Sequence, residues 1–244
     1  MADLYGSTPD GIVYKQNASS WADARDATSG SVSAGGSASS AFTDVRRSSG
    51  RSGTAYGVYR SFMYFDTSGI TGTVSSATIK IHGYTGNDGS VIAVKSTAFG
   101  GDGSASLTAT DFNNISGFST GSSLAGNATV YGPQILTSSW STSGYNDFTG
   151  TSDLRADMQN NDVVIICFMD YTNDYLNSAL TSNVTLNCGG YFTEGAGSSK
   201  DPYIEYTVSA ASGYTHGVNS VAAASISKVN TVATASIGKI NSVD

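Results

Sequence analysis

The stretch that decides the fold is V-Y-R-S-F-M-Y-F-D, residues 58–66, followed by V-S-S-A-T-I-K-I-H-G-Y, residues 74–84. The first run is apolar or aromatic at nearly every position, which suits a strand that is covered on both faces. The second run alternates with a period of two, as a half-buried strand does. Its apolar residues face one way (Ala77, Ile79, Ile81), and its polar residues face the other way (Thr78, Lys80, His82). Two such strands so close in sequence predict a β-sandwich.

The composition also favours an all-β protein. Of its 244 residues, 13% are charged and 29 are glycines, which is typical of short strands joined by many turns. The formal net charge is −7, whereas nucleic-acid binding needs clustered Lys and Arg. We therefore expect no nucleic-acid partner. The one local basic cluster lies in or beside a Gly/Ser-rich stretch and is predicted to be a solvated loop (Arg46, Arg47, Arg51, Arg60).

Membrane and secretion signals give negative expectations. No apolar run approaches the length of a membrane span, so we expect no membrane partner. Residues 1–14 lack a charged segment followed by an apolar one, so we expect synthesis in the cytoplasm without a cleaved signal. In that setting Cys167 and Cys188 are expected to be free thiols, and a disulfide between adjacent strands stays open as the alternative.

The remaining elements divide the chain into a sandwich domain, a hinge and a tail. Short strands recur up to residues 203–208, and one convincing helix is predicted over residues 152–160, with Ser152 as its cap. Residues 21–26 are compatible with an extended segment or a single helical turn. Residues 29–53 are mostly Gly, Ser and Ala, which predicts a long loop. We predict a sandwich domain over residues 1–208, a hinge over 209–217 and a tail over 218–244.

The tail carries an internal repeat of the form V-N-x-V-A-x-A-S-I-x-K, which starts at Val218, returns at Val229 and begins again at Ile240. A period of 11 residues is that of a right-handed coiled coil. The repeat is rich in Val, Thr, Ser and Asn, which form helices poorly, so short strands are favoured. A segment this small cannot bury its apolar stripe alone. We expect assembly contacts through the apolar positions of the tail: Val218, Val221, Ile226, Val229, Val232, Ile237, Ile240 and Val243.

The central pair of strands resembles the signature of DNRLRE-type jelly-roll domains. Residues 59–66 and 74–81 match the pattern R-S-hydrophobic-hydrophobic-x-F-D, a spacer, and V-x-S-A-T-L-x-L. The predicted helix before the strand at residues 163–169, and D-P-Y-I-E-Y-T-V at residues 201–208, also fit. The resemblance covers roughly residues 9–208 and implies a jelly-roll β-sandwich. It says little about function, because one fold hosts many tasks.

The tail resembles C-terminal repeats of tailed-phage structural proteins. Together with the jelly roll, this resemblance implies a non-enzymatic virion component, such as a capsid decoration, head-fibre or tail-associated protein. It implies virion proteins as partners, the major capsid or a tail protein among them, and a location in the virion. Because the apolar tail positions need partners, we expect the chain to self-associate as a trimer.

Residues that carry catalytic or metal chemistry are sparse. The chain has two histidines, His82 on the polar face of a strand and His216 in the hinge, and both are predicted to be structural or solvated. Asp66 is expected to tie a turn through its own side chain. The Gly-rich segments 86–89 and 100–103 lack the alternating acids of a Ca²⁺ loop and are predicted to be plain turns. We therefore expect no cofactor, metal ion or catalytic residue.

Two other functional classes stay open beside the virion hypothesis. The chain has 14 tyrosines and two tryptophans, Trp21 and Trp140, and exposed aromatic rings can stack on sugars. A carbohydrate-binding or adhesion module that recognises a host glycan is therefore the alternative, although aromatic residues in a sandwich more often belong to the core. A polysaccharide-active enzyme is a third hypothesis, which requires two carboxylates facing each other across a cleft.

Overall fold

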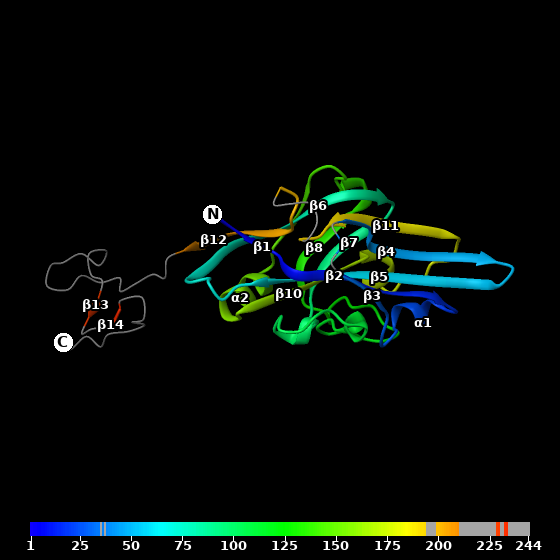
Figure 1. Ribbon diagram of the computed structural model, residues 1–244, viewed down its shortest axis with the longest axis horizontal. Coiled ribbons are helices and arrows are strands. Elements are labelled where there is room, and N and C mark those ends of the chain that lie inside the picture. The colour runs from blue at the N-terminus through cyan, green and yellow to red at the C-terminus, as the bar shows by residue number, and fades with distance from the viewer. Residues whose placement is uncertain (35, 37, 194–198, 210–227, 230–231, 234–244) are drawn as a thin grey trace.

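The computed structural model describes residues 1–34, 36, 38–193, 199–209, 228–229 and 232–233 (Figure 1). The described residues up to 209 form an all-β sandwich of the jelly-roll kind, and every strand pair in the described part of the chain is antiparallel. The smaller sheet contains β1 (Ala2–Tyr5), β12 (Tyr203–Ser209), the first part of β6 (Thr73–Asn87) and β9 (Tyr145–Thr149).

The larger sheet is built around β5 (Gly53–Asp66) and β10 (Val163–Met169). Its other strands are β2 (Ser7–Ala18), β3 (Ser31–Ala34), β4 (Ala38–Gly50), β7 (Ser90–Lys95), β8 (Val130–Leu136) and β11 (Val184–Tyr191). The second part of β6 pairs with β11 and so joins the two sheets.

The pair of strands that predicted the sandwich is confirmed. Residues 58–63 of β5 are all buried, as expected for a strand that is covered on both faces. In β6 the apolar Ala77, Ile79 and Ile81 are buried, while the polar residues between them are only half-buried. The sequence period of two therefore reports which face of each sheet looks inward.

The prediction of a long loop over residues 29–53 is wrong. This stretch holds β3 and β4, and β4 is paired with β5 on one edge and with β11 on the other. Pairing on both edges satisfies the backbone, so Gly, Ser and Ala are held extended in spite of their low strand propensity. Phe42 and Val45, an odd number of positions apart, anchor β4 in the hydrophobic layers on its two opposite faces.

The predicted helix is confirmed as α2 (Ser152–Asn160), with its buried face at Leu154 and Met158. Its cap is Thr151 rather than the predicted Ser152, because the Leu154 N–H donates to the Thr151 hydroxyl at 3.3 Å. Of the two alternatives for residues 21–26, the helical turn is found, as α1 (Trp21–Arg25). Short 3₁₀ and π turns complete the helical content of the described residues (Phe99–Gly101, Ala109–Asn113, Thr137–Ser139, Tyr171–Tyr175).

The larger sheet is covered differently on its two faces. On one face it packs against the smaller sheet through an apolar layer that includes Met63 and Phe168. On the other face lie α1 and residues 98–128 and 171–180, which together we call the loop layer; Figure 1 shows α1 and residues 98–128 on the same side of the sheet. Within each central strand of the larger sheet, alternate residues therefore enter different cores, as Phe62 and Met63 of β5 do.

Cys167 and Cys188 are both free and buried. Cys167 belongs to the core under the loop layer, whereas Cys188 belongs to the core between the sheets. Because the two thiols face opposite sides of the larger sheet, the disulfide alternative is excluded. Burial raises the pKa of the Cys188 thiol to about 12, so it behaves as a small apolar group at neutral pH.

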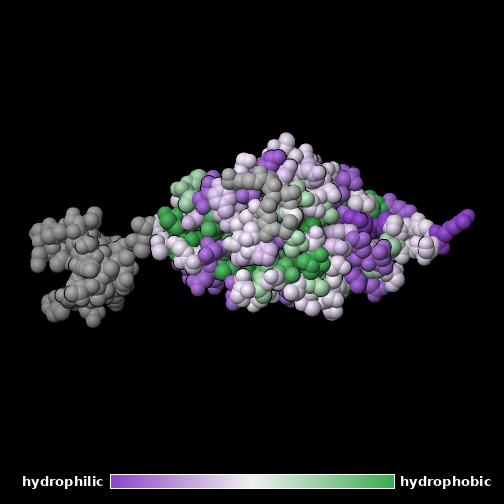
Figure 2. All heavy atoms as spheres, in the orientation of Figure 1, coloured by the Kyte–Doolittle hydropathy of each residue, from purple (hydrophilic) through white to green (hydrophobic). Residues whose placement is uncertain are grey.

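Arg60 corrects the prediction that the basic cluster is a solvated loop. Its side chain is fully buried beneath the loop layer, where its guanidinium donates two hydrogen bonds of 2.7 Å to the carboxylate of Asp174. Burial lowers the pKa of Arg60, but the charge and hydrogen bonds of Asp174 outweigh this and raise the pKa above its ordinary value. Arg46 and Arg47 also depart from the prediction, because they are half-buried residues of β4. Arg51 is exposed in the turn between β4 and β5, at the end of the body where Figure 2 shows hydrophilic residues gathered.

Most of the predicted tail contacts lie outside the described residues: Val218, Val221, Ile226, Ile237, Ile240 and Val243. The backbone is described at Val229 in β13 (Lys228–Val229) and at Val232 in β14 (Val232–Ala233), and these two residues pair antiparallel. This short pair agrees with the expectation of strands rather than a coiled coil at that one position.

Candidate functional site

The two tryptophans do not form an exposed stacking surface. Trp21 is 8% exposed and donates its indole N–H to the side chain of Asn177, and Trp140 is 7% exposed and donates to the Gly189 carbonyl. Both belong to hydrophobic cores, as is usual for aromatic residues in a sandwich. A sugar platform on this protein would therefore have to consist of other aromatic residues.

A continuous group of tyrosines lies on the outer face of the smaller sheet and extends along β6 to β11, away from the core. We call it the tyrosine face, and it consists of Tyr5, Tyr84, Tyr145, Tyr191, Tyr203 and the imidazole of His82. Neighbouring ring centroids lie 5.1–5.6 Å apart, and four of the five contacts are edge-to-face. This geometry is favourable for aromatic rings and fixes each ring against the next.

Strand register produces the tyrosine face. Tyr5 of β1 stands opposite Tyr203 of β12, and His82 of β6 stands opposite Tyr145 of β9. Side chains at every second position of a strand share one face, so His82 and Tyr84 both point outward from β6. Ring contacts then run across the strands from Tyr5 through Tyr203 and Tyr145 to His82.

The ends of the tyrosine face are the most accessible to a ligand. Tyr84 is 50% exposed and Tyr5 is 45% exposed, whereas the rings between them are half-buried. The ammonium group of Lys200 lies 4.5 Å from the ring centroid of Tyr191, and Lys80 pairs with Asp147 at 2.8 Å beside the rings. The face therefore combines apolar rings with hydrogen-bonding groups at their edges.

The phenol groups of Tyr145 and Tyr203 are neutral donors at physiological pH. Burial, aided by the neighbouring Tyr203, raises the pKa of Tyr145 to about 12. Burial also raises the pKa of Tyr203. The Tyr145 hydroxyl donates to the carbonyls of Ser199 and Asp201, which ties the face to the segment that leads into β12. The rings are thereby held in place before any ligand arrives.

The other residues singled out from the sequence have structural roles or lie outside the described residues. His82 packs edge-to-face between Tyr145 and Tyr191, and His216 lies outside the described part of the chain. Asp66 accepts hydrogen bonds from the backbone and hydroxyl of Ser68, which confirms that it ties a turn.

Neither Gly-rich segment forms an acidic cage in the part of the chain that the structure describes. Asp102, in the segment 100–103, accepts from the Ser104 N–H at 3.0 Å, as a turn residue does. The described residues contain no group of three or more His, Cys, Asp or Glu side chains placed to hold a metal ion. Over the same residues, no helix has the length and apolar character needed to cross a membrane.

Comparison with known proteins gives no assignment. No protein-family model matches this chain, and none of the curated proteins searched matches it.

Proposed function

We propose that this protein is a non-enzymatic structural component of a tailed-phage virion. In this proposal the jelly roll is displayed on the particle, and residues 218–244 make the assembly contacts with virion proteins and with other copies of the chain, as a trimer. The observation that carries the proposal is the near-identical 11-residue repeat, whose apolar positions form a stripe that is too small to be buried by the tail alone.

The experiment that tests this proposal is removal of residues 214–244. We expect the truncated chain to keep the far-ultraviolet circular dichroism and the cooperative unfolding of the sandwich, because residues 1–209 supply two large apolar cores among their described residues. We expect self-association, measured by light scattering after size-exclusion chromatography, to be lost. Incorporation into particles, measured by electron microscopy, should be lost with it.

A matched pair of point variants separates the apolar stripe from general effects of charge. Val229→Asp places a carboxylate on the stripe, and Asn230→Asp places the same charge one residue away, at a polar position of the repeat. We expect only the first variant to weaken self-association. A full-length chain that is a monomer at micromolar concentration, or a truncated chain that still assembles, would contradict the proposal.

The tyrosine face favours a second candidate function, recognition of a glycan on a host surface. Its rings offer apolar surfaces to the faces of pyranose rings, and the groups at their edges offer partners to sugar hydroxyls. On a glycan array we expect saturable binding that is lost in the double variant Tyr5→Ser/Tyr84→Ser. Tyr171→Ser, which removes a half-buried tyrosine from the loop layer, is the control and should bind as the unmodified chain does.

A further inference from the structure

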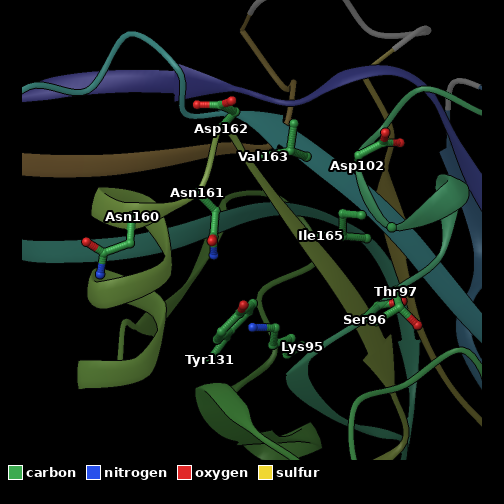
Figure 3. A pocket seen from close by; sticks show the side chains of 11 residues that line it. Lys95, Ser96, Thr97, Asp102, Tyr131, Asn160, Asn161, Asp162, Val163 and Ile165 are labelled. Carbon is green, nitrogen blue, oxygen red and sulfur yellow. The ribbon is translucent and has the colours of Figure 1, made fainter.

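A polar hollow of about 650 Å³ opens beside the end of β7, remote in sequence from the tail and separate from the tyrosine face (Figure 3). Its walls come from the end of β7, the turn at residues 101–102, Tyr131 of β8, and the segment that joins α2 to β10. The side chains include one lysine, two carboxylates, two amides, two hydroxyl groups of Ser and Thr, one phenol and two aliphatic groups (Lys95, Asp102, Asp162, Asn160, Asn161, Ser96, Thr97, Tyr131, Val163, Ile165).

The inner wall is organised by Asp157, a residue of α2. Its Oδ2 atom accepts from Lys95 Nζ at 2.8 Å and from the Tyr131 hydroxyl at 2.5 Å, and its Oδ1 atom accepts from Asn161 Nδ2 at 3.0 Å. Burial opposes the ionisation of Asp157, but these hydrogen bonds outweigh it and lower its pKa. Lys95 and Asn161 are therefore held in position, and each keeps further N–H donors for a ligand.

The wall formed by residues 160–162 is fixed from behind by Thr67. The Thr67 N–H donates to the Asp162 carbonyl at 2.8 Å, and its hydroxyl donates to the Asn161 carbonyl at 2.6 Å. The hollow therefore exists before any ligand binds, and a ligand would not have to order this segment.

The outer part of the hollow is acidic. Asp102 and Asp162 are both exposed, and Figure 3 shows them at one end of the hollow, with Lys95 and Tyr131 at the other end and Ile165 between. Because Asp157 already neutralises Lys95, the two outer carboxylates determine the electrostatic potential. An anionic ligand is disfavoured there, whereas a neutral hydroxylated ligand finds strong acceptors.

We infer that this hollow binds one or two residues of a neutral saccharide. The half-buried Val163 offers an apolar contact for the C–H face of a sugar ring, and the surrounding amides, ammonium group and carboxylates match hydroxyl groups as donors and acceptors. The volume is within the usual range for small-molecule sites. The inference does not depend on the tail or on the tyrosine face.

The test uses the full-length chain labelled with ¹⁵N and titrated with neutral disaccharides (cellobiose, maltose, lactose) and with digalacturonate. We expect saturable amide shifts centred on Lys95, Asn161 and Asp162 with at least one neutral disaccharide, and binding at least about 10-fold weaker with the dianionic probe, which corresponds to roughly 1.4 kcal/mol. Absence of saturable shifts with every neutral probe, or equal binding of digalacturonate, would overturn the inference.

Variants locate the binding to this hollow. Asn161→Ala removes one side-chain donor from the wall and should weaken neutral-sugar binding about 10-fold. Asp162→Asn keeps the shape of the side chain and should reduce the discrimination against digalacturonate, which gives a second readout if Asn161→Ala folds poorly. Asp153→Asn, on the exposed side of α2, and Tyr84→Ser, on the tyrosine face, should both bind as the unmodified chain does.

Two further outcomes would overturn the inference. Unchanged affinity in both hollow variants would place the sugar elsewhere, and loss of binding in Tyr84→Ser would assign it to the tyrosine face. A titration with CaCl₂ that produced the same amide shifts would identify the hollow as a cation site. None of these results would bear on the assembly proposal, which is tested by truncation of the tail.

Discussion

The larger sheet is covered by a second sheet on one face and by loops on the other, and the two coverings are held by different forces. Between the sheets, apolar and aromatic contacts predominate, as where Phe168 packs between Phe42 and Phe148 with ring centroids 5.1 and 5.7 Å away. Under the loop layer, apolar contacts are joined by a fully buried ion cluster of Arg25, Arg60 and Asp174.

The difference follows from how the backbone N–H and C=O groups of the smaller sheet and of the loop layer find hydrogen-bond partners. Strands pair with one another, so a sheet reaches the core with most of its N–H and C=O groups already bonded. The loop layer is bonded mainly through local turns, such as the Gly101 N–H to the Ala98 carbonyl at 2.9 Å. Buried arginines add further bonds: Arg60 donates to the carbonyls of Phe112 and Arg25, and Arg25 donates to those of Asp174 and Ser119. The ion cluster therefore links segments of the loop layer that local turns do not connect.

The largest effect is expected from Asp174→Ala, which leaves two buried guanidinium groups without their shared carboxylate. Removal of one partner from a buried ion pair costs about 4 kcal/mol in the free energy of unfolding. Because the loss falls on the loop layer, we also expect residues 98–128 to become sensitive to proteolysis before the sandwich unfolds. Urea unfolding and limited proteolysis measure the two effects.

The control for Asp174→Ala is Arg51→Ala, which removes an exposed charge from the turn between β4 and β5. We expect this variant to change the free energy of unfolding by less than about 0.5 kcal/mol. An Asp174→Ala chain that behaved like the control would show that the ion cluster does not hold the loop layer.

On the other face of the sheet, Phe168→Ala should cost about 3 kcal/mol through the cavity that it leaves. In this variant the lost side-chain contacts lie between the two sheets, and the backbone pairing of the strands remains. We therefore expect a single cooperative transition at lower urea, with residues 98–128 no more sensitive to proteolysis than before. Early cleavage of those residues in Phe168→Ala would mean that the two coverings are not independent.

The sequence predicts the apolar packing between the two sheets much better than the polar contacts under the loop layer. The alternation in residues 74–84 and the continuous apolar run before it predict two central strands, because a period of two is a local property of the chain. The Gly/Ser-rich surroundings predict a solvated Arg60, and this prediction is wrong because its partner, Asp174, lies 114 residues away, beyond the reach of a local pattern. The sequence contains one indication that Arg60 is buried, because it lies inside an apolar run and such a run predicts burial for each of its residues.

The candidate surfaces were predictable only in part. The outward direction of His82 follows from the same alternation, but the neighbours that complete the tyrosine face come from other strands, and the register between strands cannot be read from one sequence. The hollow could not be predicted for the same reason, because its groups come from distant parts of the chain: Lys95 and Asp157 are 62 residues apart. Residues 29–53 were predicted as a loop from their Gly and Ser content, which was overridden by pairing on both edges of β4.

A smaller effect on stability is expected from the ionisation of Asp157, which lies in α2, outside both the smaller sheet and the loop layer. Burial opposes this ionisation, but hydrogen bonds from Lys95, Tyr131 and Asn161 lower the pKa of the folded state below the ordinary value of 3.8. The stabilisation is therefore fully present above about pH 4 and is lost as the pH falls through the folded-state pKa. Urea unfolding in acid should show a steeper loss for the unmodified chain than for Asp157→Asn, with Asp153→Asn matching the unmodified chain.

The smallest effect on stability is expected at the tyrosine face, against which no second sheet or loop layer packs in the described residues. Tyr84→Ser removes a ring that is 50% exposed and one edge-to-face contact with Tyr191, so the free energy of unfolding should fall by less than about 1 kcal/mol.

Tyr145→Ser is the matched comparison, because Tyr145 is half-buried, touches two rings and donates to the carbonyls of Ser199 and Asp201. It should cost about 2 kcal/mol more than Tyr84→Ser, since both packing and hydrogen bonds are lost. If Tyr84→Ser cost as much as Phe168→Ala, the outer end of the tyrosine face would be packed against another part of the same chain, and it would not be available to a glycan.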